Sequence, residues 1–475
     1  MDKKLLCGAA SRLANPWSEI TAAFPGFSDT ILDDQLVRAI ALGDGEKRYL
    51  IVCWDSGPPD AEEFCGKLKE RTGIDMEHVF LMNVPNHSTI PCADEAKHFV
   101  NPRKRFHQIR KFSDVQKEAM AKYSEYVSNQ ALDAIDEALA NMRPAKMGHA
   151  KGESYINTCR NQHFNVEQPD GTVKTHYATG VEPKGLVDRT LFIIKFIDAQ
   201  TEEPIAFFVN YPMANMATIS NNMGKDGKIA ITGDVAGNCC HYMEDKFPGS
   251  VAIWSCGPAG NTNPMMSLQM SYPDPMTGAP VRLYAKGAEY GEIILKLLST
   301  RHFADAMEVE RSITHFTDRT ALGSVIEWSE TPGYDENSEI HEGIYKVRLQ
   351  SLRVGDVMLV SISGGSMYCS FAEQMRSVSP FRETYFIDAR GINFANSEYL
   401  LDDWVFEQCE PPEIRINMGP RDMPHDNNDP KAERVMKFDS KIDDCIVGSE
   451  HSQIVPGTLA DSLMAHTVSM GEKLL

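Results

Sequence analysis

Short apolar runs that end in polar turns alternate with helix-like segments along most of this 475-residue chain. Residues 49–55, 79–84, 251–256 and 357–362 are apolar runs of strand length, and each is followed by a turn that contains Gly, Pro or Asn. Alternation of buried strands with helices is typical of α/β proteins. The pattern therefore predicts an α/β fold with a mixed multi-stranded sheet as its core and helices on its faces.

Two segments carry clear signals for the start of a helix. Asp60 is followed three residues later by Glu63, which is a capping-box signature, and Gly73 predicts the end of that helix. A longer helix is predicted from Ser113, where the same spacing recurs and apolar residues follow at helical intervals, up to residues 143–144.

Further elements complete the expected domain. A charged turn separates the apolar runs 191–196 and 205–210, which predicts a β-hairpin, and helices are expected near 287–303, 366–376 and 458–475. Residues 419–431 are rich in Pro, Asp and Asn and are expected to form a surface loop. Because repeats and long linkers are absent, we expect residues 1–475 to form one domain.

The net charge of the chain argues against two classes of partner, nucleic acids and membranes. Lys and Arg number 47 and Asp and Glu number 67, which gives a net charge of −20. Such a field repels phosphate backbones and anionic membrane surfaces, so we expect no nucleic-acid partner and no membrane partner.

No run of 18 apolar residues predicts a membrane span, and the 11 cysteines follow no framework spacing. Reduced thiols and a cytoplasmic location are expected, with a small molecule as substrate.

Five strand-end turns are the expected location of a binding site, because ligands of open α/β sheets bind where strand ends converge. These turns are residues 83–88, 210–215, 232–237, 256–264 and 363–366.

Charged and titratable residues in or near these turns are the candidates for chemistry. His87 can act as a general acid or base near neutral pH, or it can hydrogen-bond to a loop carbonyl. Arg160 can clamp a carboxylate, phosphate or sugar hydroxyl, or form an exposed salt bridge. Asp234 can serve as a base or as a helix N-cap. Asn261, Thr262 and Asn263 offer neutral donors of the kind found in an oxyanion hole.

The order of the turns resembles that of the catalytic domain of neutral/alkaline ceramidases, a family of zinc-dependent amidases. Residues 33–39 are similar to the family's "DDLYARAL"-like segment, residues 79–91 occupy the place of its "THTHSGP" motif, and Tyr211-Pro212 that of its "HP" motif. The segment 8–27, an Asn–Arg element at 157–161, residues 186–188 and the turn 257–264, which resembles "GDVSPN", also match in order. The resemblance spans roughly residues 5–410 and implies the ceramidase catalytic-domain fold without the family's C-terminal sandwich domain.

The resemblance also implies that the family's zinc ligands are replaced. Its first zinc histidine falls near Pro85, with His87 at a second histidine that binds no metal. Its next zinc histidine corresponds to Tyr211, its zinc glutamate to Gly365, and its tyrosine ligand to Tyr399. The family's nucleophilic serine corresponds to Asn263. Since one tyrosine cannot hold zinc, the expected site has no metal and no cofactor.

Three functional hypotheses follow. The first is a metal-independent enzyme that acts on a small hydroxylated amide, lactone or sugar derivative, with His87 and Asp234 as acid–base pair and Arg160 as clamp. Tyr211, Tyr399 and residues 261–263 would then bind the substrate. The second is a relative that binds a ligand or partner without catalysis, and the third, which requires a shifted motif alignment, is a zinc-dependent amidohydrolase. Oligomeric state is left open.

Overall fold

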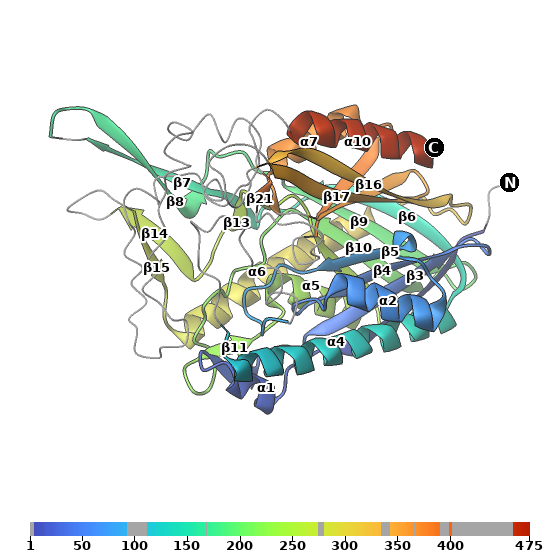
Figure 1. Cartoon of the computed structure of the whole chain (residues 1–475), viewed down its shortest axis with the longest axis horizontal. Helices are drawn as coiled ribbons and strands as arrows, with labels where there is room; N and C mark the ends of the chain where they lie inside the picture. The colour runs from blue at the N-terminus through green and yellow to red at the C-terminus, as the bar shows by residue number, and fades with distance from the viewer. Residues whose placement is uncertain are drawn as a thin grey trace.

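A computed structural model describes residues 4–92, 112–167, 169–273, 280–333, 343–363, 366–389, 399–400 and 459–475. These ranges form a mixed α/β fold with an eight-stranded mixed sheet and seven α-helices (Figure 1). The helices are α1 (Ser18–Ala22), α2 (Ala61–Thr72), α4 (Asp114–Ala140), α5 (Asp234–Lys246), α6 (Ala288–Arg311), α7 (Cys369–Val378) and α10 (Leu459–Leu474).

The largest sheet consists of two four-stranded halves. Read outward from the junction, one half has the order β6 (Arg143–Glu153), β9 (Thr190–Asp198), β10 (Pro204–Tyr211) and β12 (Val251–Cys256). The other half, read outward in the same way, has the order β1 (Leu6–Leu13), β3 (Leu36–Gly43), β4 (Arg48–Trp54) and β5 (Val79–Asn83). The halves join at a two-residue pairing between β1 and β6. Because β12 also lies against β3, β4 and β5, the two halves fold over each other and enclose the largest apolar core.

A second sheet and several short pairings complete the strands. The second sheet has the order β16 (Leu322–Gly333), β17 (Gly343–Val354), β18 (Val357–Ser363) and β20 (Glu383–Asp388). The short pairings are β2 (Phe27–Ile31) with β11 (Ile229–Ile231), β14 (Gln269–Pro273) with β15 (Pro280–Tyr284), and β19 (Ser366–Met367) with β21 (Tyr399–Leu400). β13 (Thr262–Pro264) pairs with β7 (Asn157–Glu167), whose far half forms with β8 (Val173–Glu182) a ribbon that projects from the body in Figure 1.

Helices cover the outer faces of the sheets. α4 packs on β1 and β3, whereas α5 packs on β12 and α6 on β6 and β9. α7 and α10 share an apolar core with the second sheet. Within the described ranges, no helix is both long enough and apolar enough to cross a membrane.

The local signals in the sequence predicted several elements correctly. Asp60 caps α2 by accepting from the Glu63 amide at 3.0 Å, and Gly73 ends that helix with φ of 72°, a left-handed conformation that suits glycine. Ser113 and Gln116 form both hydrogen bonds of a capping box at the start of α4. The predicted hairpin is the antiparallel pair β9–β10.

Three boundaries differ from the prediction, and tertiary contacts explain each. α4 ends at Ala140 because the residues after it enter strand β6. α6 continues to Arg311, since its last turns bury Ala306, Met307 and Val309. α7 begins only at Cys369, because the two residues of β19 pair with β21 instead. A helix, α10, occupies most of 458–475, and the expected loop 419–431 lies outside the described residues.

Candidate functional site

Hydrogen bonds join four of the five strand-end turns into one continuous network, whereas residues 364–365 of the fifth turn lie outside the described residues. The turn after β5 bonds to the turn before α5, and that turn bonds to the turn after β10. The turn after β10 is also hydrogen-bonded to the turn after β12. The turn after β12 is hydrogen-bonded to strand β19, which follows β18 in the chain. The linking bonds, which measure 2.8–3.2 Å, are Thr232 N to Ser88 O, Asn215 Nδ2 to Gly233 O, Gly257 N to Tyr211 O, and Gly260 N to Met367 O.

Arg160 and the segment 261–263 lie together at one end of this network. The Arg160 amide donates to Asn261 O at 2.9 Å, and its guanidinium Nη2 donates to Gly260 O at 2.6 Å. The Thr262 hydroxyl donates to Pro212 O at 3.2 Å. Arg160 is only 5% exposed, so the exposed salt bridge considered from the sequence is not what the structure contains.

Asn261 and Asn263 differ in how their side-chain amides are used. Asn261 Nδ2 donates to Leu186 O at 2.7 Å, and its Oδ1 accepts from the Cys369 amide at 3.1 Å, so the side chain links residue 186 to the start of α7. Asn263 is 3% exposed, and its Oδ1 accepts no hydrogen bond within the described part of the chain.

Tyr211 is turned into the core. Its hydroxyl donates to Ser154 O at 2.7 Å, its ring lies 4.7 Å from that of His302, and burial raises the pKa of the phenol. The side chain of Tyr399 lies outside the described residues. Its backbone pairs with Ser366 in β19, the strand whose Met367 accepts a hydrogen bond from Gly260 in the turn that follows β12.

A buried polar relay that includes a serine, a histidine and an aspartate lies behind Tyr211. Trp254 Nε1 donates to His302 Nε2 at 3.0 Å, His302 Nδ1 lies 3.2 Å from Ser154 Oγ, and Ser154 Oγ donates to Asp305 Oδ2 at 2.7 Å. Because the indole can only donate, Nε2 must be the acceptor and Nδ1 carries the proton.

Which atom donates each hydrogen bond determines whether this relay could activate the serine as a nucleophile. A nucleophilic serine gives its proton to a histidine nitrogen, whereas Ser154 accepts from His302 and donates to Asp305. Burial lowers the pKa of His302 to about 3, so the ring stays neutral. The relay therefore anchors α6 to β12 and to the strand that carries Tyr211. No sequence signal brings together residues that lie about 150 positions apart.

Asp234 is fully buried, and its carboxylate already accepts several hydrogen bonds. Oδ2 accepts from the amide and the hydroxyl of Thr218 at 2.9 and 2.8 Å, and Oδ1 accepts from Val235 N at 2.7 Å. Its backbone has φ of 55°, a left-handed conformation that aspartate tolerates better than most residues. Burial raises the pKa of the carboxyl. These bonds fix the segment 217–218 to the start of α5, while Gly233 rather than Asp234 occupies the N-cap position.

His87 is half-buried, and its Nδ1 lies 3.1 Å from Pro85 O. The neighbouring Ser88 hydroxyl lies 3.0 Å from that of Thr218, which in turn donates to Asp234. His87 and Asp234 therefore belong to the same part of the network, with two hydroxyl side chains between their segments.

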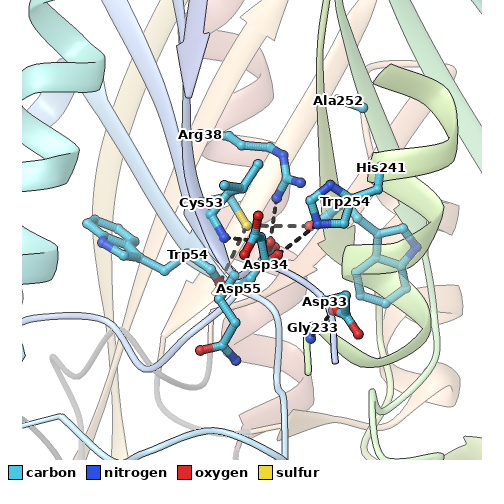
Figure 2. A network of polar contacts seen from close by, with 12 residues as sticks. Asp33, Asp34, Arg38, Cys53, Trp54, Asp55, Gly233, His241, Ala252 and Trp254 are labelled. Atoms are coloured by element: carbon cyan, nitrogen blue, oxygen red, sulfur yellow. Dashed lines mark hydrogen bonds and ion pairs between the residues drawn. The ribbon is translucent and has the colours of Figure 1, made fainter. Parts of the chain in front are cut away.

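An ion cluster adjoins the turn that precedes α5 (Figure 2). Arg38 pairs with Asp55 at 2.6 Å and with Glu244 at 2.8 Å, and the Arg38 and Asp55 side chains are each 2% exposed. Asp33 accepts from Gly233 N at 2.6 Å, and burial raises the pKa of Asp33 to about 6. The cluster fixes the segment before β3 against this turn.

The resemblance stated from the sequence implies a zinc site, but the described residues do not fit zinc. Among them, no three His, Cys, Asp or Glu side chains lie close enough together to hold a metal ion. Of the positions matched to zinc ligands, Pro85 has no ligating side-chain atom, and the Tyr211 hydroxyl donates to a backbone carbonyl. Gly365 and the side chain of Tyr399 lie outside the described residues. We therefore derive no step through zinc.

One surface hollow, of about 320 Å³, lies away from these turns. Its lining is His149, Arg353, Asp356, Pro380, Phe381, Arg382, Glu383 and Leu475, none of which was predicted as a site residue.

Comparison with solved structures supports the predicted fold. The chain is similar to neutral ceramidase from Pseudomonas aeruginosa, with a TM-score of 0.58 and 14% identity over 86% of this chain and 70% of that one. It is equally similar to a ceramidase complexed with C2, with a TM-score of 0.57 and 13% identity over 85% of this chain and 70% of that one. No protein-family model and no curated protein sequence matches the chain. At this identity the likeness establishes a ceramidase-like α/β fold and nothing about activity.

Proposed function

We propose that this protein binds a small hydroxylated molecule at the joined strand-end turns and acts on it by acid–base chemistry at His87. The observation that carries the proposal is the hydrogen-bonded network that joins these turns, with buried neutral polar groups at one end and a half-buried histidine at the other. The solved structures to which this chain is similar are named ceramidases, so an amide, or a lactone of similar geometry, is the substrate class we favour.

The roles of the residues follow from their contacts. A carbonyl can only accept, so the contact with Pro85 places the proton of neutral His87 on Nδ1 and makes Nε2 its basic nitrogen. Arg160 would orient the substrate through a guanidinium held at Gly260 O. Tyr211 and Asn261 would then shape the site from behind rather than bind the substrate, since their polar atoms already have protein partners.

A second candidate function is ligand binding without catalysis. The contacts of Asp234 favour it, because a carboxylate that already accepts from Thr218 and Val235 is poorly available as the second member of an acid–base pair.

Gluconamide and glucono-1,5-lactone are suitable probes, because both are hydroxylated and both give gluconate on hydrolysis. Binding would be measured by calorimetry, and turnover by ammonia release from the amide or acid release from the lactone. Metal content would be measured by elemental analysis before and after chelator washing.

We expect the wild type to turn over at least one probe with or without chelator washing. We expect His87→Gln to reduce kcat about 100-fold or more while binding persists. His149→Gln, a substitution in the distant hollow, serves as the control and should leave both kcat and the binding affinity unchanged. Binding without turnover would establish the second candidate. Stoichiometric zinc whose removal abolishes turnover would contradict both candidate functions and indicate a zinc amidohydrolase. Failure of the wild type to bind either probe would contradict the proposal.

A further inference from the structure

Asn263 is a buried residue whose side-chain oxygen has no hydrogen-bond donor among the described residues. Only 3% of the residue is exposed, and its Oδ1 accepts no hydrogen bond within the described part of the chain. Asn157 and Asn161, on the neighbouring strand β7, also have a side-chain oxygen that accepts no hydrogen bond among the described residues, although their side-chain nitrogens donate to other groups. Asn215, fully buried, donates to Gly233 O at 2.9 Å and accepts from Ala236 N at 3.1 Å.

A buried amide oxygen without a hydrogen-bond donor is unfavourable for the folded protein. Leaving such a group without a partner destabilises the folded protein by the lost hydration of the group, and an apolar side chain of the same shape avoids this loss. β13 contributes three residues to its sheet, and both neighbours of Asn263 in that strand are also buried. A polar residue at this position therefore needs a reason outside the stability of the fold.

The position of Asn263 gives that reason. Asn263 is directly opposite Thr158 in the antiparallel pair β7–β13, so both side chains lie on one face. Arg160 is two residues further along β7, which returns it to the same face, at roughly 7–8 Å from Asn263 by strand geometry. The Asn263 amide thus shares a face with the buried guanidinium assigned above to substrate orientation.

We infer that Asn263 determines specificity by binding a neutral group of the ligand that both donates and accepts, namely a hydroxyl or a primary carboxamide. A carboxamide side chain offers one acceptor oxygen and two N–H donors, which such a group satisfies together. A carboxylate only accepts and would leave Oδ1 unpaired, and an ammonium only donates and cannot accept from Nδ2. This inference rests on the proposed function and extends it to the class of group that the site selects.

Gluconamide and gluconate test the inference, since they differ only in the carboxamide and the carboxylate. Affinity would be measured by calorimetry for the wild type, for Asn263→Leu and for Asn263→Ser. The urea midpoint of each protein would be measured in parallel, with Asn215→Leu as the matched control.

We expect the wild type to bind gluconamide at least tenfold more tightly than gluconate, because a site that leaves a buried partner unpaired discriminates strongly. Asn263→Leu should lose at least tenfold in affinity for gluconamide with an unchanged or higher urea midpoint. Asn263→Ser, which keeps a donor and an acceptor, should retain the preference for gluconamide. Asn215→Leu should lower the urea midpoint, since it breaks two hydrogen bonds.

The outcomes separate this inference from the proposed function. Equal binding of the two compounds, or unchanged affinity in Asn263→Leu, would overturn the inference and leave the proposed function standing. A lower urea midpoint for Asn263→Leu would also overturn it, because the amide would then have a partner within the protein. Failure of the wild type to bind either compound would overturn the proposed function, and the inference with it.

Discussion

The buried relay at His302 predicts a specific dependence of stability on pH. His302 is fully buried, and desolvation lowers the pKa of its ring to about 3 from an ordinary value of 6.5. Between these values the folded protein holds the ring neutral, whereas the unfolded chain binds a proton. Unfolding therefore takes up a proton, and the free energy of unfolding falls as the pH falls below 6.5, by about 1.4 kcal/mol per pH unit.

The substitution His302→Gln isolates this contribution. Glutamine can accept from Trp254 and donate to Ser154, as the histidine does, but it does not titrate. Between pH 6.0 and 4.5 the wild type should lose about 2 kcal/mol more of its unfolding free energy than the variant. Urea unfolding of both proteins at four pH values across this range measures the difference. Parallel pH profiles would refute the reasoning, because they would mean that the ring titrates normally in the folded protein.

Three further predictions concern the fold. Arg38→Met should lower the free energy of unfolding by about 3–5 kcal/mol, measured by urea denaturation, because it leaves Asp55 and Glu244 in place without their cation; a loss below 1 kcal/mol would contradict this. Ser113→Ala should cost about 1 kcal/mol in the same assay through loss of the α4 cap, and an unchanged midpoint would show that the cap contributes nothing. Glu327→Gln should speed proteolytic cleavage of α10, since this carboxylate binds three α10 side chains, and cleavage at the wild-type rate would count against it.

Short-range signals in the sequence were enough for many of the elements. The apolar run before residue 55, the capping boxes at Asp60 and Ser113, and the hairpin spacing between β9 and β10 each depend on residues a few positions apart. The ceramidase-like fold was predicted from the order of the strand-end turns, and the solved structures confirm it at the level of the fold. Helix ends were less predictable, because strand pairing after α4 and packing at the end of α6 set them.

The candidate site was predictable as a set of segments but not as a set of side-chain roles. Four of the five turns named from the sequence are hydrogen-bonded to one another. The sequence could not show that Tyr211 faces Ser154 or that Thr218 binds Asp234, since each contact joins residues distant in the chain. It also could not show that Asn263 Oδ1 accepts no hydrogen bond from the part of the chain that the structure describes. The catalytic and substrate-binding roles assigned to these residues remain predictions.

The most direct test of the central claim is a crystal structure of the protein soaked with gluconamide. We expect the ligand at the joined turns, with its carboxamide or a hydroxyl within about 3 Å of both polar atoms of the Asn263 side chain. Ligand bound elsewhere, for example in the hollow beside Arg353 and Phe381, with the Asn263 amide bonded only to protein, would contradict the account.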